Sequence, residues 1–322
     1  MTNKPPVLLL TERKDLAADL LVHRLREKNI SFLRFNSEDF PSAVNLSWTP
    51  AGELILIPKS GLPVSLQKVR SAWYRRRPLL KTPRSVTMRA VKEFVSSEAG
   101  MFLEGYWRST SWSWMNHPDR VSFSENKLTQ LHLARSLGLP IPRTSVTNDP
   151  KAIRAFCRSQ QGTIAKPLSA GGIPWGKGSL LAFTVPLSSR DVKASRPLRL
   201  APCIYQERVR KVADIRVTVV GQEVFTAEIL SKAGSPCDWR LADPKDIQYR
   251  PHRLAPRMRR LCLRLLRALG LSYGAIDLGL DAHGDYFFFE INPSGQWGWI
   301  EHHTSQPITA AIVRDLMEAN EG

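Results

Sequence analysis

The sequence lacks the features that define several large protein classes. Its 322 residues include four cysteines, and none of them belongs to a CxxC pair that could begin a zinc site or a redox centre. The longest apolar runs, such as residues 7–10, fall far short of the roughly 20 residues that cross a bilayer, and the start has no apolar signal segment. We therefore expect reduced, packed cysteines and a cytoplasmic protein with no membrane partner.

Acidic residues are scarce in this chain. Its 29 Asp and Glu face 46 Lys and Arg, and the resulting formal charge of +17 is divided between the first 120 residues and the rest. Such a field attracts any polyanion, whether nucleic acid, a membrane surface, a nucleotide or an acidic peptide, so charge alone does not choose a partner. The 43% of hydrophobic residues exclude a disordered chain, and the length predicts two or three compact domains.

Several catalytic signatures are also absent. No GxGxxG follows the first predicted strand, which removes support for a Rossmann dinucleotide site. The GxxxxGK[ST] order of a Walker A loop does not occur, and neither do the GxSxG and HExxH motifs of hydrolases and metalloproteases. Any chemistry must come from a different set of residues.

Apolar periodicity predicts an α/β module of about 110 residues at the start of the chain, which is an ordinary domain size. Residues 7–10 form a β-type run, helical spacing follows over residues 16–25, and further strands are predicted at residues 31–35 and 53–57. Later helices are predicted at residues 124–137, 151–157 and 256–269, with strands between them.

Two stretches of the sequence are strongly basic. Residues 68–92 carry nine Lys or Arg and no acidic residue, and within them Trp73 and Tyr74 directly precede Arg75 and Arg76. Guanidinium groups hold carboxylates and phosphates by paired hydrogen bonds, which favours binding of an acidic partner over a merely solvated surface. Residues 247–267 hold seven arginines and no acid, and they form a second positive surface.

A β-hairpin is predicted between residues 273 and 291. With residues 282–285 as the turn, the register pairs Asp281 with Tyr286, Asp277 with Glu290 and Ala275 with Asn292. Two carboxylates and an amide then converge in an otherwise apolar hairpin, although like charges across a sheet are destabilising. A cation between them resolves this conflict, and oxygen ligands of this kind suit Mg²⁺ with a bound phosphate. An exposed polar strand end is the alternative.

A glycine-rich segment follows a predicted strand that ends at Lys166. Glycine lets main-chain amides approach phosphate oxygens closely, and the lysine adds a fixed positive charge. The candidate phosphate contacts are Lys166, Gly171, Gly172 and Gly176. A flexible surface hairpin explains the same glycines.

Two further charged pairs allow two interpretations each. Asp214 and Arg216 share one face of a predicted strand, either as a structural ion pair or with Arg216 directed at a transferring phosphoryl group. Asp238 and Arg240 follow in a loop, either as surface residues or as substrate contacts.

Taken in order, these segments resemble an ATP-grasp ligase. The ordered set is Asn126-Lys127, Lys166-Pro167, the glycine loop, Gln206 to Val209, Asp214 to Arg216, Asp277, and Glu290 to Asn292. More closely, the segments 73–76, 238–240 and 290–297 are similar to those of the microviridin-type ATP-grasp peptide maturases, the graspetide synthetases. With them the resemblance spans most of the chain. It departs from the family pattern at Ser294, where Asn is expected.

The resemblance implies an α/β fold of the ATP-grasp type with ATP between two β-rich lobes. It implies an N-terminal pre-ATP-grasp domain over residues 1–115 that binds the peptide, a central lobe with the glycine-rich flap over residues 116–205, and a C-terminal lobe with the metal site over residues 206–322.

The resemblance also implies a role for each candidate residue. ATP would be held by Lys127, Lys166, Gly171, Gly172, Gly176, Gln206, Glu207 and Val209. Mg²⁺ would be held by Asp277, Glu290 and Asn292. The catalytic residues would be Arg216, Asp214 and Arg240, and the peptide would contact Trp73, Arg75, Arg76 and Asp238.

The implied enzyme is an ADP-forming ligase that joins carboxylates to alcohols or amines. It would activate Asp and Glu side chains of an acidic ribosomal precursor peptide, made of leader and core, as acylphosphates. Ser or Thr hydroxyls or Lys amines of that peptide would then displace phosphate and close macrocyclic ester or amide links. A homo-oligomer is compatible with the family.

Two alternatives stay open. A RimK-like ligase that adds amino acids to a protein or peptide would share the nucleotide and metal residues. A basic nucleic-acid-binding protein would explain the charge but not the trio Asp277, Glu290 and Asn292, so nucleic acid is the less favoured partner.

Overall fold

The computed structural model describes residues 5–51, 53–58, 62–76, 78, 80–169, 173–175, 178–180, 184–193, 198–231 and 237–318. Its helices are α1 (Leu16–Glu27), α2 (Arg89–Ser109), α3 (Pro118–Ser124), α4 (Lys127–Ser136), α5 (Pro150–Arg158), α6 (Ser189–Lys193), α8 (Pro256–Leu269), α9 (Gly298–Thr304) and α10 (Ile308–Glu318). This mixture of helices and strands confirms the predicted α/β class, and the helices expected around residues 124–137, 151–157 and 256–269 are present as α4, α5 and α8.

The strands form several separate sheets. Those near the start are β1 (Val7–Thr11), β2 (Phe32–Asn36), β3 (Val44–Trp48), β4 (Leu54–Pro58), β5 (Val64–Ser65), β6 (Ser71–Tyr74) and β7 (Ser113–Met115). The middle strands are β8 (Thr144–Thr147), β9 (Thr163–Lys166), β10 (Ile173–Trp175), β11 (Gly178–Leu180), β12 (Val185–Pro186) and β13 (Cys203–Glu207). The last are β14 (Lys211–Val220), β15 (Glu223–Ser231), β16 (Ile247–Pro251), β17 (Tyr273–Asp281) and β18 (Tyr286–Asn292).

The first sheet is parallel, with the strand order β2-β1-β6-β7, and it begins with the strand, helix and strand that the sequence predicts. Helices cover both of its faces, because Val7 shares a core cluster with Leu21 of α1 whereas Leu8 shares one with Trp107 of α2. Such two-sided burial is why β1 is an unbroken apolar run rather than an alternating one. A small antiparallel sheet, β3-β4-β5, lies beside it.

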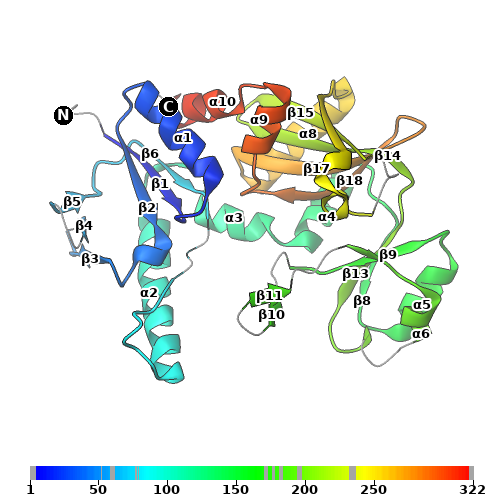
Figure 1. Ribbon diagram of the computed structural model, residues 1–322, viewed down its shortest axis with the longest axis horizontal. Coiled ribbons are helices and arrows are strands. Elements are labelled where there is room, and N and C mark those ends of the chain that lie inside the picture. Colours follow the sequence, from blue (N-terminus) through cyan, green and yellow to red (C-terminus); the bar gives the residue numbers. More distant parts are fainter. Residues whose placement is uncertain are drawn as a thin grey trace.

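The second and third sheets are antiparallel and lie on the right of Figure 1, one below the other. The lower sheet has the order β12-β9-β13-β8, and the upper sheet has the order β16-β15-β14-β17-β18. One face of the upper sheet is covered by α8, whose Leu265 packs in one cluster with Val217 of β14 and Ile276 of β17. Alternation along the strands therefore turns Arg216 and Asp277 to the opposite face.

The β17–β18 hairpin has the predicted register only at the end away from its turn. Asp277 lies opposite Glu290 and Ala275 opposite Asn292, as the sequence predicts. The predicted pairing of Asp281 with Tyr286 is wrong, because a bulge after Asp277 shifts the register and pairs Leu280 with Tyr286. The Asp281 carboxylate instead accepts hydrogen bonds from two turn amides, His283 N at 2.9 Å and Asp285 N at 2.9 Å.

The end of the chain returns to its beginning. Figure 1 shows α10 beside α1, and Trp297 and Ile312 share a core cluster with Val7 and Leu21. The cysteines are free in the structure, with Cys262 buried and the other three half-buried. Among the helices of the described residues, none combines the length and the apolar composition that a membrane span requires.

A buried ion pair joins the first sheet to the segment that follows β18. The Arg75 side chain is 1% exposed, and its Nε lies 3.3 Å from Oδ2 of the fully buried Asp15. The guanidinium carbon lies 5.5 Å from the ring centre of Trp73 and 5.0 Å from that of Trp297. Arg75 also donates to the Ser294 carbonyl. One side chain therefore links β6, the start of α1 and the loop before α9.

The electrostatics of this pair follow from its burial. Burial lowers the pKa of Arg75 to about 10, which still leaves it charged at neutral pH. Burial alone would raise the pKa of Asp15, but Arg75 and Arg76 outweigh it and the pKa lies below its usual value. The pair therefore stays ionised within the protein interior.

These positions correct one expectation from the sequence. The family resemblance implies that Trp73 and Arg75 contact the peptide, but both are 1% exposed and Arg75 is already bound to Asp15 and Ser294. Arg76, by contrast, has a side chain that is 25% exposed and also reaches the Ser294 carbonyl at 3.3 Å. Of these three residues, Arg76 is the one that an incoming peptide can reach in this structure.

Replacing Arg75 with Met should remove about 3–5 kcal/mol from the free energy of unfolding, because it leaves the Asp15 carboxylate in the interior without its main partner. Urea denaturation followed by tryptophan fluorescence measures this change. The comparison variant is Arg76→Met. Arg76 Nε also lies 3.4 Å from Asp15 Oδ2, but its side chain is 25% exposed, so its loss should cost less than the loss of Arg75. Equal losses in both variants would show that the buried pair has no special role.

Candidate active site

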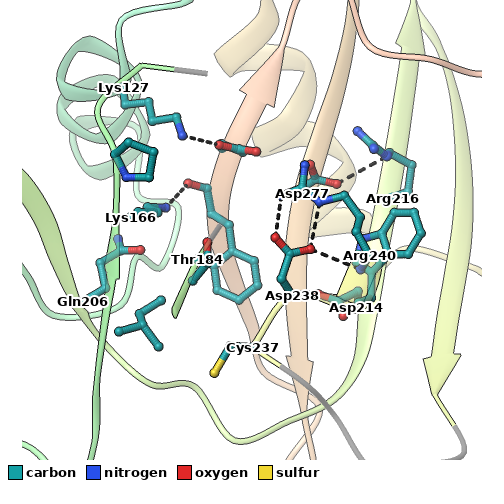
Figure 2. A pocket seen from close by; sticks show the side chains of 15 residues that line it. Lys127, Lys166, Thr184, Gln206, Asp214, Arg216, Cys237, Asp238, Arg240 and Asp277 are labelled. Atoms are coloured by element: carbon teal, nitrogen blue, oxygen red, sulfur yellow. Dashed lines mark hydrogen bonds and ion pairs between the residues drawn. The ribbon is translucent and has the colours of Figure 1, made fainter. Parts of the chain in front are cut away.

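A pocket opens between the second and third sheets and gathers half of the predicted site residues (Figure 2). Its charged lining consists of the cations Lys127, Lys166, Arg216 and Arg240 and the carboxylates Asp214, Asp238, Asp277 and Glu290. The remaining lining is Ile164, Pro167, Thr184, Gln206, Cys237, Trp239 and Phe289. The structure thus brings together residues that lie far apart in the sequence.

Lys127 enters the pocket from the first turn of α4. The Asn126 side chain caps this helix by accepting hydrogen bonds from the amides of Leu128 at 3.0 Å and Thr129 at 3.1 Å. Lys127 Nζ lies 3.1 Å from Glu290 Oε2 on β18. Burial would raise the pKa of Glu290, but Lys127 and Lys166 outweigh it and hold the pKa below its usual value.

Lys166 reaches from the lower sheet to the upper one. Its Nζ donates a hydrogen bond of 3.1 Å to the carbonyl of Phe289, the residue before Glu290. The register of β18 shifts at this position, so the bulge gives the Phe289 carbonyl a partner outside its own sheet. Burial lowers the pKa of Lys166 to about 8, with Glu290 opposing this effect.

Gln206 on β13 is fully buried against the pocket. Its amide nitrogen donates to the Thr144 hydroxyl at 2.9 Å, whereas Oε1 has no hydrogen-bond partner among the described residues. A buried acceptor without a partner is costly and points to a ligand that donates a hydrogen bond there.

A row of three charged residues crosses the upper sheet. Arg216 on β14 lies opposite Asp277 on β17, which lies opposite Glu290 on β18. Arg216 Nε is 3.3 Å from Asp277 Oδ1, and its guanidinium carbon lies 5.7 Å from the ring centre of Trp299. Burial raises the pKa of Asp277 to about 6, against the opposing effect of Arg216.

Two more ion pairs lie on the side of the pocket that the upper sheet forms. Lys211 Nζ lies 2.5 Å from Asp214 Oδ1, and burial raises the pKa of Asp214 in spite of this partner. Asp238 accepts two side-chain hydrogen bonds from Arg240, at 2.8 and 2.6 Å. The Arg240 side chain is 53% exposed, so the buried Asp238 carboxylate holds a guanidinium that reaches solvent (Figure 2).

Other predicted residues lie away from this pocket. Glu207 is directed outward and pairs with Arg143 at 3.2 Å, and it lines a smaller neighbouring pocket with Val209. Asn292 is exposed one pleat beyond Glu290, and its side chain accepts from the Ser294 amide at 2.8 Å. The predicted flap residues Gly171, Gly172 and Gly176 lie outside the described residues.

Several residues of the site are not apparent from sequence patterns. Lys211 lies at the start of β14 and neutralises Asp214. Trp239 and Trp299 contact each other in a tilted arrangement beside Arg216, with ring centres 5.3 Å apart. Lys211 precedes Asp214 by three residues in a strand, a spacing that does not ordinarily place two side chains on one face. The register irregularity between Lys211 and Ala213 brings them together.

Two family models match the chain. The model of the MvdD pre-ATP grasp domain matches residues 6–122, and the model of the RimK-like ATP-grasp domain matches residues 190–316. Among curated proteins, the probable alpha-L-glutamate ligase of Saccharophagus degradans is 27% identical over 210 residues, which are 64% of this chain and 67% of that protein.

Solved structures match over almost the whole length. The macrocyclase MdnC of Microcystis aeruginosa MRC, bound with precursor peptide MdnA, is 29% identical with a TM-score of 0.87, over 97% of this chain and 99% of that one. A RiPP-associated ATP-grasp ligase of Chryseobacterium gregarium, in complex with ADP and a leader and core peptide, is 25% identical with a TM-score of 0.88, over 98% and 97%.

These similarities confirm the predicted ATP-grasp fold, whose nucleotide and metal chemistry the pocket residues can support. MdnC and the Chryseobacterium enzyme match both the leading unit and the ATP-grasp part, whereas the glutamate ligase matches about two thirds of the chain. The chain is an ATP-grasp ligase that resembles the macrocyclases of ribosomal peptides.

Proposed function

We propose that this ligase activates Asp or Glu side chains of a ribosomal precursor peptide and links them to Ser or Thr hydroxyls or Lys amines of the same peptide. The observation that carries the proposal is the pocket, which has lysines suited to phosphates on one side and a row of carboxylates and arginines on the other. The similarity to MdnC over 97% of the chain supports a peptide as the acceptor.

The residues on the lower side of the pocket fit ATP. Oε1 of Gln206 is buried, lacks a partner among the described residues, and can accept a hydrogen bond from the exocyclic amine of adenine. Lys127 and Lys166 line the same pocket, one against Glu290 and the other against the Phe289 carbonyl, and phosphates would bind beside them. Gly171, Gly172 and Gly176 stay predicted flap contacts.

The upper side fits Mg²⁺. Asp277 and Glu290 offer two carboxylates on neighbouring strands, and Asn292 follows on the same strand. The described residues contain no group of three or more His, Cys, Asp or Glu that could hold a metal ion. Mg²⁺ is commonly held by one or two carboxylates together with substrate phosphates, so this incomplete set is appropriate. The ion would neutralise charge on the phosphates.

The proposed reaction has two steps. An oxygen of the peptide carboxylate attacks the terminal phosphorus of ATP, the bond to the bridging oxygen breaks, and ADP leaves. Arg216 stabilises the charge that develops on the transferred phosphoryl group. A hydroxyl oxygen or amine nitrogen then attacks the acyl carbon and loses its proton, and phosphate leaves with the bonding electrons. Asp238 orients Arg240, which is placed to bind the incoming carboxylate.

The basic surface supports an acidic peptide. Arg76 and Arg240 remain accessible in a protein of charge +17, which raises the encounter rate with an anionic substrate and makes binding sensitive to salt. We also propose that residues 1–115 recognise the peptide, that residues 116–205 and 206–322 enclose ATP, and that the enzyme acts in the cytoplasm.

A second candidate function is addition of amino acids to a protein or peptide. The curated relatives favour it, since they are named as probable alpha-L-glutamate ligases at 27% identity or less. The two candidates share the nucleotide pocket and differ in the second substrate.

The deciding experiment measures the intact mass of a precursor peptide rich in Asp, Glu, Ser and Thr, encoded beside this gene, after incubation with Mg-ATP. Macrocyclisation predicts loss of one water per link, dependent on ATP. A gain of whole amino-acid masses when free amino acids are supplied would establish the second candidate instead. Unchanged peptide mass with both substrates present, despite ADP release, would exclude this peptide as the substrate.

Replacing Gln206 with Met should raise the KM for ATP by about tenfold, since one hydrogen bond to a buried acceptor is worth about 1 kcal/mol or more. The variant should also discriminate less against GTP, whose base carries an oxygen at the position of the adenine amine. Steady-state ADP release with both nucleotides measures this. If the variant kept the wild-type ratio of ATP to GTP turnover, Gln206 would not contact the base.

Replacing Glu290 with Gln should lower ATP turnover by about 100-fold or more, because it removes a negative charge from the Mg²⁺ and Lys127 side of the pocket. The matched control is Asp285→Asn in the exposed turn of the same hairpin, which should keep normal turnover. Circular dichroism should show both variants folded. Normal turnover of the Glu290 variant would refute its assignment to the metal.

A further inference from the structure

Arg216 has few partners for a residue whose direction matters in the proposed reaction. Its Nε lies 3.3 Å from Asp277 Oδ1, a contact that Figure 2 marks, yet this nitrogen is buried and makes no hydrogen bond of good geometry to any described residue. A guanidinium group has five N–H donors, and a single ion-pair contact leaves its plane free to turn. The direction of the Arg216 side chain therefore needs a second contact.

The second contact is the ring of Trp299 on α9. The guanidinium carbon of Arg216 lies 5.7 Å from the centre of this ring, within the range of a cation–π interaction, and indole is the aromatic group that attracts cations most strongly. The Arg216 side chain is 12% exposed, so little water weakens the attraction. Arg216 thus lies between a carboxylate of β17 and an aromatic ring of α9.

The structure fixes Trp299 more firmly than it fixes Arg216. The next residue of α9, Ile300, is fully buried, and Trp299 packs against the core cluster to which Ile300 belongs. The Trp299 ring also contacts the rings of Trp239 and Tyr249, with ring centres 5.3 and 5.2 Å away. A flat side chain whose rotamer is locked by packing on several sides can direct a more mobile neighbour.

The two contacts of Arg216 differ in what happens to them during the proposed reaction. Asp277 is one of the carboxylates assigned to Mg²⁺, and a metal ion bound to this carboxylate weakens its attraction for Arg216. The ring of Trp299 is uncharged, and Mg²⁺ takes oxygen ligands, so the ion does not compete for the ring. The contact with Trp299 is therefore the one that persists when the site is filled.

We infer that Trp299 is a positioning residue whose ring directs Arg216 at the transferred phosphoryl group once Asp277 has turned to Mg²⁺. The inference rests on the proposed function, from which it takes the role of Arg216. The described residues that line the pocket do not include Trp299, so it acts through Arg216. A guanidinium group that is already directed needs no reorganisation when charge develops on the phosphoryl oxygens, which lowers the barrier to transfer.

The first test compares two substitutions of Trp299 by steady-state ADP release with the precursor peptide. Trp299→Phe keeps an aromatic face and should keep kcat within about threefold. Trp299→Leu keeps apolar bulk without that face and should lower kcat about tenfold or more, the size expected for a cation–π contact away from water. The KM for ATP should stay within about twofold in both. The control is His303→Leu, because the exposed His303 ring stacks on Tyr249 rather than on Trp299, and it should keep kcat.

A double-mutant cycle separates positioning from packing. If Trp299 acts through Arg216, adding Trp299→Leu to Arg216→Met should change kcat by less than about twofold, because the group that the ring directs is already gone. An equal loss in both backgrounds would show that Trp299 only supports the fold and would overturn the inference, as would equal kcat values for the Phe and Leu variants. Melting temperatures identify an unstable variant, and Trp299→Met then takes the place of Trp299→Leu.

A structural readout does not depend on the peptide. In crystals grown with Mg²⁺ and a non-hydrolysable ATP analogue, Arg216 should point at the terminal phosphate in the wild-type and Trp299→Phe proteins and should turn away in Trp299→Leu. An unchanged Arg216 in the Leu variant would overturn the inference. If the crystals show the expected difference while the wild-type enzyme leaves the peptide mass unchanged, the proposed substrate is wrong and the positioning role of Trp299 stands.

Discussion

The contact between Arg75 and Asp15 is the interaction on which the placement of the candidate site depends. A charged pair removed from water loses hydration, and its mutual attraction repays this loss only when the geometry is good and further hydrogen bonds support the pair. Two indole rings and the Ser294 carbonyl surround this pair, which therefore specifies one arrangement of β6, α1 and the segment after β18. Because Glu290 and Asn292 precede that segment directly, an ion pair outside the pocket holds one of its walls.

Inside the pocket, charge is balanced before any substrate binds. Lys127 pairs with Glu290 and Arg216 with Asp277, so the site avoids the cost of isolated charges at low dielectric. In the proposed reaction the phosphates would take the lysines as partners and Mg²⁺ would take the carboxylates. Each charged group would then replace one partner of opposite charge by another. This requires less reorganisation than exposing charges that had no partner before.

Sequence patterns predict the local elements well and the long-range contacts poorly. The pairing of Asp277 with Glu290 is foreseeable because both interrupt apolar strands of one hairpin. The bulge is not foreseeable, because the two-residue alternation of a strand gives no sign that one strand carries an extra residue. Arg75 resembles a surface arginine because its partner Asp15 lies 60 residues earlier, and nothing in the local sequence indicates that the two meet. Gln206 is foreseeable only through the family resemblance.

The core shared by the two ends of the chain constrains synthesis on the ribosome. Val7 and Leu21 leave the ribosome long before Trp297 and Ile312, which complete their cluster. The first sheet therefore stays partly uncovered until Ile312 has been translated, and its apolar face needs protection from aggregation during that time. The leading unit therefore cannot complete its packing before the ATP-grasp part does, because the two parts share the cluster that Trp297 and Ile312 complete.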